Sequence, residues 1–68
     1  MTLSPRMVEI AALIAEHDLT VREIAVRLEV APRTVRGYIE DAGRRLPGPH
    51  RPRIKLIIWW VQSSRVAA

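Results

Sequence analysis

The chain has 68 residues, no cysteine and a formal net charge of +4 at pH 7. This length allows one small domain, residues 1–68, whose own core is marginal and benefits from completion by a second chain. The absence of cysteine excludes disulfides and thiolate zinc sites. A domain this small also has few residues available to line a catalytic pocket. We therefore expect a protein that is not an enzyme.

The charge is divided unevenly along the chain. Residues 1–32 carry three basic and five acidic side chains, net −2, whereas residues 33–68 carry eight basic and two acidic ones, net +6. A basic half beside a mildly acidic one indicates a surface for a polyanion, although basic residues also keep small domains soluble. No signal peptide or membrane-spanning run is recognisable, so we expect a cytoplasmic protein without a membrane partner.

Capping residues and hydrophobic spacing predict two helices in the first half. Ser4 is a good N-cap before Pro5, and the helix runs to about residues 16–18. Thr20 and Glu23 form a capping box that begins a second helix. The first helix is expected to bury Val8, Ala11, Ala12 and Ala15, widened by Ile10, Leu13 and Ile14, and the second to bury Ile24, Ala25 and Leu28.

A third helix is predicted from Pro32 to about Leu46, after a tight connection at residues 29–31. Its apolar stripe consists of Val35, Ile39, Ala42 and Leu46, helped by Tyr38, and its other side carries Arg33, Arg36, Gly37, Glu40 and Arg44. Residues 46–52 contain three prolines and a glycine, which predict a loop.

The last segment, from Arg53 to about Ser64, is apolar on most of its circumference. Its β-branched and aromatic residues favour a strand, but a lone strand has no partner in a helical chain, so we predict a fourth helix. Adjacent helix positions point about 100° apart. We therefore expect one tryptophan in the core and the other in an apolar patch, which we interpret as a dimer interface rather than a ligand site. This interface is drawn from Leu56, Ile57, Trp59 and Trp60.

Two short helices joined by a three-residue turn are typical of the helix-turn-helix. The blocks Leu3-Ser4-Pro5-Arg6-x-x-Glu9-Ile10, Leu19-Thr20-x-x-Glu23-Ile24-Ala25-x-Arg27-Leu28 and Thr34-Val35-Arg36 resemble the LuxR/GerE-type DNA-binding domain. The resemblance continues through Arg44-Arg45-Leu46 and Arg53-x-x-Leu56-Ile57-x-Trp59. It implies an all-α, four-helix domain whose third helix enters the major groove and whose fourth helix commonly forms the dimer contact. Met1 directly precedes the motif, so we expect the free-standing form, or else an excised domain.

The resemblance also implies which residues touch DNA. Base contacts fall on Arg36, Gly37 and Glu40, and phosphate contacts on Thr20, Arg33, Thr34, Arg44 and Arg45. Glu40 can accept from cytosine N4, or it can pair with Arg36 or Arg44 at i, i+4 spacing. In two respects the chain departs from the family pattern. Glu40 and Asp41 replace basic or neutral polar residues, and Ala31 replaces the usual hydroxyl N-cap.

These features predict a sequence-specific transcription regulator that binds double-stranded DNA as a homodimer and uses no cofactor or metal. His17 and His50 are single and far apart in the sequence, which argues against a metal site. One alternative is an adaptor that docks on RNA polymerase or a larger regulator through the helix of Trp59 and Trp60. Glu40, Asp41 and the excess apolar surface favour it. Another is the DNA-binding end of a recombinase or phage protein.

Overall fold

The computed structural model describes residues 3–67, with side chains described as far as Ser64, and folds them into four helices. These are α1 (Pro5–His17), α2 (Val21–Leu28), α3 (Pro32–Arg45) and α4 (Pro52–Ala67). Within the described range there is no strand, which confirms the all-α prediction. None of these helices is long and apolar enough to cross a lipid bilayer.

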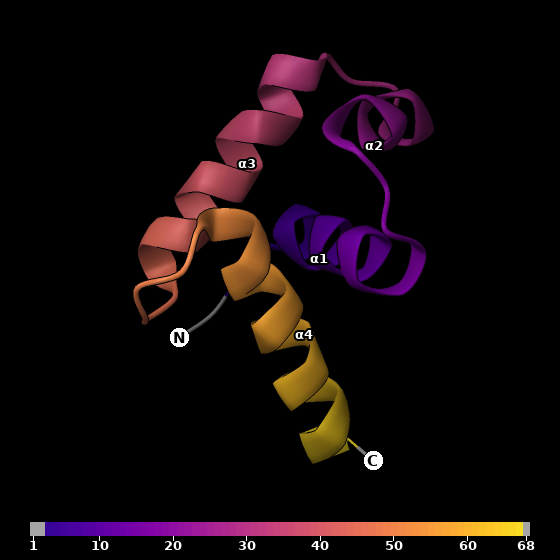
Figure 1. Cartoon of the computed structure of the whole chain (residues 1–68). Coiled ribbons are helices and arrows are strands. Elements are labelled where there is room, and N and C mark those ends of the chain that lie inside the picture. Colours follow the sequence, from indigo (N-terminus) through magenta and orange to yellow (C-terminus); the bar gives the residue numbers. More distant parts are fainter. Residues whose placement is uncertain (1–2, 68) are drawn as a thin grey trace.

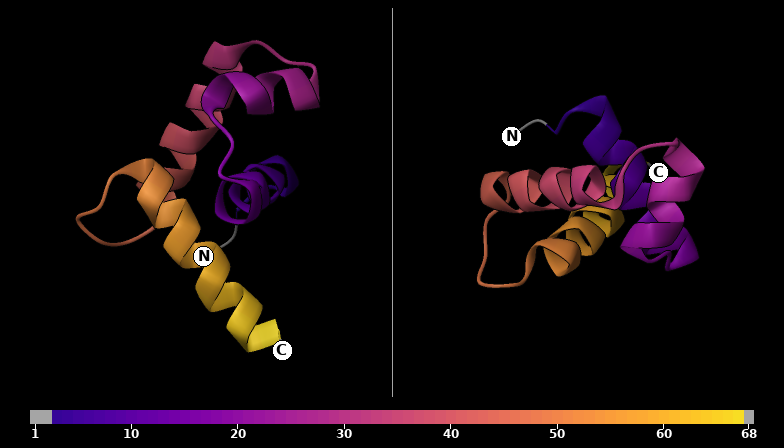
Figure 2. Two further views of the ribbon diagram at one scale, coloured as in Figure 1. Left: turned by 45° about the vertical axis from the view of Figure 1, so that its right-hand side comes forward. Right: turned by 90° about the horizontal axis from the view of Figure 1, so that it is seen from above.

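The helices are arranged around α1, which packs against both α3 and α4. Figures 1 and 2 show α3 and α4 joined at one corner by a loop and diverging from it, with α2 lying against the other end of α3. Helix α4 begins one residue earlier than predicted and continues past Ser64. This arrangement leaves one long side of α3 outside the packed helices.

Local capping fixes the ends of the first two helices. The Ser4 hydroxyl accepts a hydrogen bond from the Met7 amide at 3.3 Å, and α1 ends at Asp18, which is left-handed (φ 51°). At α2 both halves of the capping box are present: the Glu23 amide donates to the Thr20 hydroxyl at 3.2 Å, and the Thr20 amide donates to the Glu23 carboxylate at 2.9 Å. The predicted capping box is therefore confirmed.

The turn between α2 and α3 is built without glycine. Glu29 takes a left-handed conformation (φ 58°), which a non-glycine residue adopts at some cost. Val30 donates its amide to the Ala25 carbonyl, which closes the turn. Helix α3 then begins at Pro32 behind Ala31, whose side chain makes no capping hydrogen bond, as the sequence predicts.

The core differs from the prediction at two places. In α1 the buried residues are Met7, Ile10, Ala11 and Ile14. The predicted face was thus centred one position too far along: the large side chains at 7, 10 and 14 belong to the core, whereas Val8 and Leu13 are only partly buried against it. In α4, Leu56 is fully buried together with Ile24 and Val35. The expectation that Leu56 contributes to an exposed interface is therefore wrong, because this chain's own core uses it.

Helices α3 and α4 approach each other most closely at Gly43. A Cβ atom at Gly43 would lie 2.7 Å from Cβ of Pro52, whereas one at Gly37 would meet nothing within 4 Å. Lys55, on α4, donates to the carbonyls of Gly43 and Leu46, both at 3.0 Å. The absence of a side chain at Gly43 therefore lets the start of α4 close over the end of α3.

The two glycines of α3 provide a matched test of this packing. Gly37→Ala should stabilise the fold by about 0.5–1 kcal/mol, because alanine is the better helix former and the site is open. Gly43→Ala should destabilise it by about 1–3 kcal/mol, because the new methyl group overlaps Pro52. Urea unfolding of both variants measures the difference. Equal stabilisation by the two substitutions would contradict the close contact.

The capping box also predicts a pH dependence. The Thr20 backbone amide, and then its hydroxyl, lower the pKa of the Glu23 carboxyl below its ordinary value of 4.5. A group with a lowered folded pKa stabilises the fold above its unfolded pKa, and this contribution is lost as the pH falls through the folded pKa. Thermal unfolding between about pH 6 and about pH 3 should therefore show a decline that Glu23→Gln reduces.

The control for this experiment is Glu16→Gln. Glu16 is exposed at the end of α1, and no hydrogen bond or ion pair is described for its side chain. The Glu16→Gln substitution should therefore leave the decline in thermal stability between about pH 6 and about pH 3 unchanged. If the two variants flatten the pH profile equally, the Thr20–Glu23 pair is not its cause.

Candidate nucleic-acid interface

The outer side of α3 is polar because its other side is buried. Val35, Ile39 and Ala42 lie in the core, which confirms the predicted stripe. All seven DNA contacts expected on this helix are exposed: Arg33, Thr34, Arg36, Gly37, Glu40, Arg44 and Arg45. The packing of α3 therefore presents these groups together on the surface.

Arg33 and Arg36 are the unpaired cations in the N-terminal half of α3, and Arg45, at its other end, is also outside the described ion pairs. Arg33 and Arg36 are both exposed, and neither takes part in any of the ion pairs found in the described part of the chain. They lie three residues apart, so they sit on neighbouring positions of one helix face. Their guanidinium groups are therefore available to an anionic partner.

Arg44 is in a different situation. Its guanidinium lies 2.6 Å from the Asp41 carboxylate and 4.0 Å from that of Glu40. Of the two roles considered for Glu40, the structure shows the ion pair within the helix, and its partner is Arg44 instead of Arg36. Two acids and one base leave this cluster with a net charge of −1. The positive potential of α3 is consequently concentrated in its N-terminal half.

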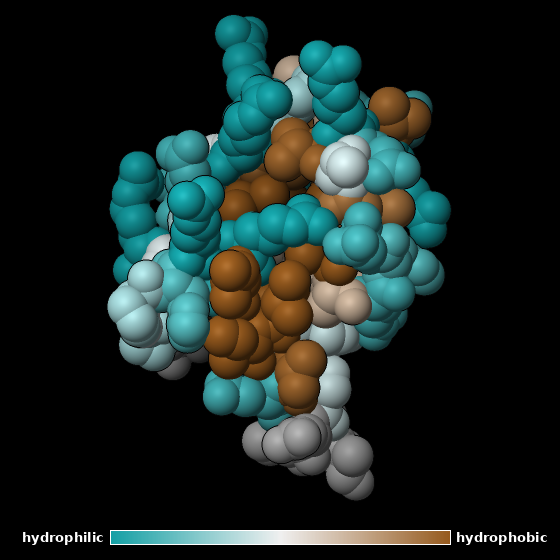
Figure 3. All heavy atoms as spheres, in the orientation of Figure 1, coloured by the Kyte–Doolittle hydropathy of each residue, from teal (hydrophilic) through white to brown (hydrophobic). Residues whose placement is uncertain are grey.

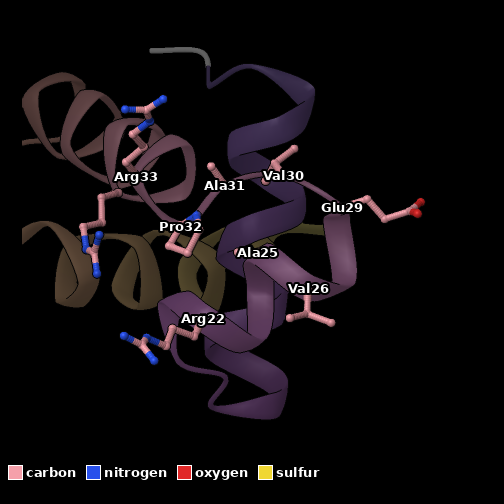
Figure 4. Close-up of a pocket in the computed structure, with 9 residues that line it drawn as sticks. Arg22, Ala25, Val26, Glu29, Val30, Ala31, Pro32 and Arg33 are labelled. Carbon is pink, nitrogen blue, oxygen red and sulfur yellow. The ribbon is translucent and has the colours of Figure 1, made fainter.

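An open hollow between α2 and the start of α3 adds a residue that the sequence analysis missed. Arg22, Arg33 and Arg36 lie on its edge, and its walls include Ala25, Val26, Ala31 and Pro32. In Figure 4, Arg22 from α2 and Arg33 from α3 extend on the same side, whereas Glu29 points away from both. The sequence did carry a signal for Arg22, because this basic residue lies in the first turn of the helix that precedes the arginine-bearing helix.

Thr20 lies at the start of α2, close in sequence to Arg22. It is exposed, but its hydroxyl already accepts the Glu23 amide, and its own amide is engaged by the Glu23 carboxylate. The charged Glu23 thus sits at the same helix end. Thr20 is therefore less free to bind a phosphate than Arg22, which has no partner among the described ion pairs.

The exposed apolar residues of α4 are not the ones expected. Ile54, Ile58 and Val61 are 44%, 37% and 45% exposed, and their i, i+4, i+7 spacing forms one stripe. Figure 3 shows an apolar patch over α4 in this orientation. By contrast, Ile57, Trp59 and Trp60 are partly buried and pack against the core. Because both tryptophans are partly buried against the core, the structure does not divide them into one core and one surface residue as expected; their indole rings lie 6.5 Å apart.

Comparisons with known proteins agree with this geometry. A family model described as "Bacterial regulatory proteins, luxR family" matches residues 1–57, which covers α1 to α3 and the first part of α4. No curated protein and no solved structure gives a significant match to the chain. The matched residues contain the arginine-bearing α3 and the hollow beside it. The chain therefore belongs to the luxR family of bacterial regulatory proteins, whose helix-turn-helix domains bind DNA.

Proposed function

We propose that this protein is a sequence-specific transcription regulator that binds duplex DNA as a homodimer, with α3 in the major groove. The observation that carries the proposal is the bare N-terminal half of α3, where Arg33 and Arg36 are exposed and outside the described ion pairs. The major groove is about 12 Å wide and accepts a helix presented in this way. Recognition helices of this class read bases with their N-terminal residues.

Base readout rests on three positions of α3. Arg36 carries a planar fork of donors that matches O6 and N7 of guanine. Gly37 has open space around it, so the helix backbone can come close to the floor of the groove. Glu40 can accept from cytosine N4, and in doing so it exchanges its long 4.0 Å contact with Arg44 for a hydrogen bond to the base.

Phosphate contacts surround this centre. Arg22 and Arg33 both line the hollow between α2 and α3, and most of its other lining residues are apolar. A DNA backbone has the complementary character, with apolar sugar carbons and charged phosphates. Thr34 and Arg45 are exposed near the two ends of α3 and supply further contacts. Arg44 contributes less, because two carboxylates already surround it.

The homodimer is assigned to the stripe of Ile54, Ile58 and Val61 on α4. A second copy presenting the same stripe would cover these side chains symmetrically, as an isologous two-fold contact requires. Two α3 helices would then enter successive major grooves about 34 Å apart. The operator is accordingly expected to be a palindrome.

Selection on random duplex DNA, followed by binding measurements with variants, tests the readout. Arg36→Ala should cost about 1–3 kcal/mol and relax preference at one base pair. Arg22→Ala should weaken binding to all sequences alike and lower the slope of log affinity against log salt by about 1. Arg27→Ala removes the same charge from α2, but Arg27 is outside the hollow, so its slope should change less.

Two results would contradict this assignment. Arg36→Ala could weaken every sequence equally, which would make Arg36 a phosphate contact instead of a base contact. Alternatively, selection could recover no preferred DNA sequence at all, which would contradict a sequence-specific regulator.

The dimer is tested on the selected operator and on its isolated half. Ile58→Glu should retain half-site affinity but lose the cooperative gain on the palindrome, because a carboxylate would be buried against the second copy. Ile58→Leu keeps the stripe apolar and should behave like the unaltered protein. Gel shift and sedimentation of the complexes measure stoichiometry. A single copy on a palindrome, with non-cooperative filling, would contradict the dimer and favour a different protein as the partner of α4.

A further inference from the structure

Lys55 joins the two helices to which the proposed function gives separate tasks. The last turn of an α-helix leaves carbonyl groups without partners in the helix. At the end of α3, the Leu46 amide donates a hydrogen bond to the Ala42 carbonyl. The Lys55 ammonium donates to the carbonyls of Gly43 and Leu46, both at 3.0 Å. A cation at this position also lies at the negative end of the helix dipole.

Two further contacts act at the same joint. Gly43 admits the ring of Pro52, with no room for even a methyl group between them. Leu56, directly after Lys55, is fully buried. Helix α4 is thus held at this joint by the Pro52 ring against Gly43, by the hydrogen bonds of Lys55 to the end of α3, and by the burial of Leu56 in the core. Contacts at three successive points restrict the direction of α4 as well as its position.

The direction of α4 has a large effect at its far end. Val61, the last residue of the exposed stripe, lies about 14 Å along α4 from Pro52, so a tilt of about 10° at the joint moves it by about 2 Å in each copy, or by about 4 Å in the two copies of a symmetric dimer together. One base-pair step of DNA is about 3.4 Å. The exposed stripe on α4 starts at Ile54, next to Lys55. A small change at the joint therefore changes the separation of two α3 helices by about one base pair.

We propose that Lys55 is a positioning residue that fixes the angle between the DNA-reading helix α3 and the dimer-forming face of α4, and thereby sets the spacing between the two half-sites of the operator. The inference rests on the proposed function, since it requires a dimer on DNA. Lys55 is assigned no contact with DNA or with the second copy, because its ammonium is already engaged at the end of α3. It acts through the carbonyl groups at the end of α3.

The test compares Lys55→Met with Arg53→Met. Methionine keeps the length and apolar stem of lysine and removes the donor. Arg53 lies on the same turn of α4 and also loses one positive charge, but its partner is the exposed Asp18 at 3.3 Å instead of α3. Binding is measured by fluorescence anisotropy on a single half-site and on palindromes whose central spacer is lengthened or shortened by single base pairs.

The unaltered protein should prefer its best spacer by about tenfold over a spacer one base pair longer or shorter. Lys55→Met should reduce this preference to about twofold, and its half-site affinity should match that of Arg53→Met. Arg53→Met should keep the original preference. Lys55→Arg retains a donor and should restore most of it. Gly43→Ala, which disturbs the joint from the other helix, should also reduce the preference.

Folding is checked separately with the tryptophans, both of which lie on α4 against the core. Their emission should remain that of a folded protein in every variant used. If Lys55→Met unfolds the chain, Lys55→Arg and Gly43→Ala decide the question by the same spacer series.

Several outcomes overturn the inference. An unchanged spacer profile in Lys55→Met would show that the joint does not set the spacing. An equal change in Arg53→Met would show that the loss of a positive charge alone causes the effect. A dimer that binds its operator without any spacer preference would also overturn the inference. Failure of the unaltered protein to select any DNA sequence would instead reject the proposed function, and the inference with it.

Discussion

The structure depends on the burial of one side of α3. Val35, Ile39 and Ala42 are buried in the core that α3 shares with α1, α2 and α4, and this burial decides which residues of α3 reach the surface. Because side chains three and four apart share a helix face, fixing the buried side also fixes the polar side. The exposed arginines need no stabilising partner of their own. Their exposure follows from the apolar residues interleaved with them, and function is in this sense a consequence of core packing.

The charges of α3 are graded along the helix instead of being spread evenly. Arg33 and Arg36 lie in the first half outside the described ion pairs, whereas Arg44 is matched with Glu40 and Asp41 in the second half. Arg22 adds a charge near the first half from the neighbouring helix. A helix that enters the groove with its N-terminal end therefore brings its positive end to the DNA, and of the acidic cluster only Glu40 is assigned a contact there, with a base instead of a phosphate.

Residues whose role follows from local pattern could be predicted from the sequence. The capping box at Thr20 and the apolar stripe of α3 depend on neighbours within a few positions, and both are present. Lys55 was missed because its partners are the carbonyls of Gly43 and Leu46, and a backbone carbonyl leaves no trace in the sequence. Leu56 was misplaced for another reason. A helix that is apolar on most sides has no periodicity to show which side is buried.

The lack of hydrophobic periodicity in α4 has a physical cause if the helix packs against its own core on one side and against a second copy on the other. Its inner side completes a small core through Leu56, and its outer stripe remains about two-fifths exposed in one copy. Full burial of an aliphatic side chain contributes about 1.5–3 kcal/mol, so covering the rest of three such residues on each of two copies contributes about 5 kcal/mol. Association costs at least about 4 kcal/mol in lost freedom of motion. The stripe alone thus gives a weak dimer, and two half-sites on one duplex would supply the effective concentration that holds the copies together. In such a system, the angle between α3 and α4 matters more than the strength of the α4 contact, because DNA and dimer can reinforce each other only when their geometries agree.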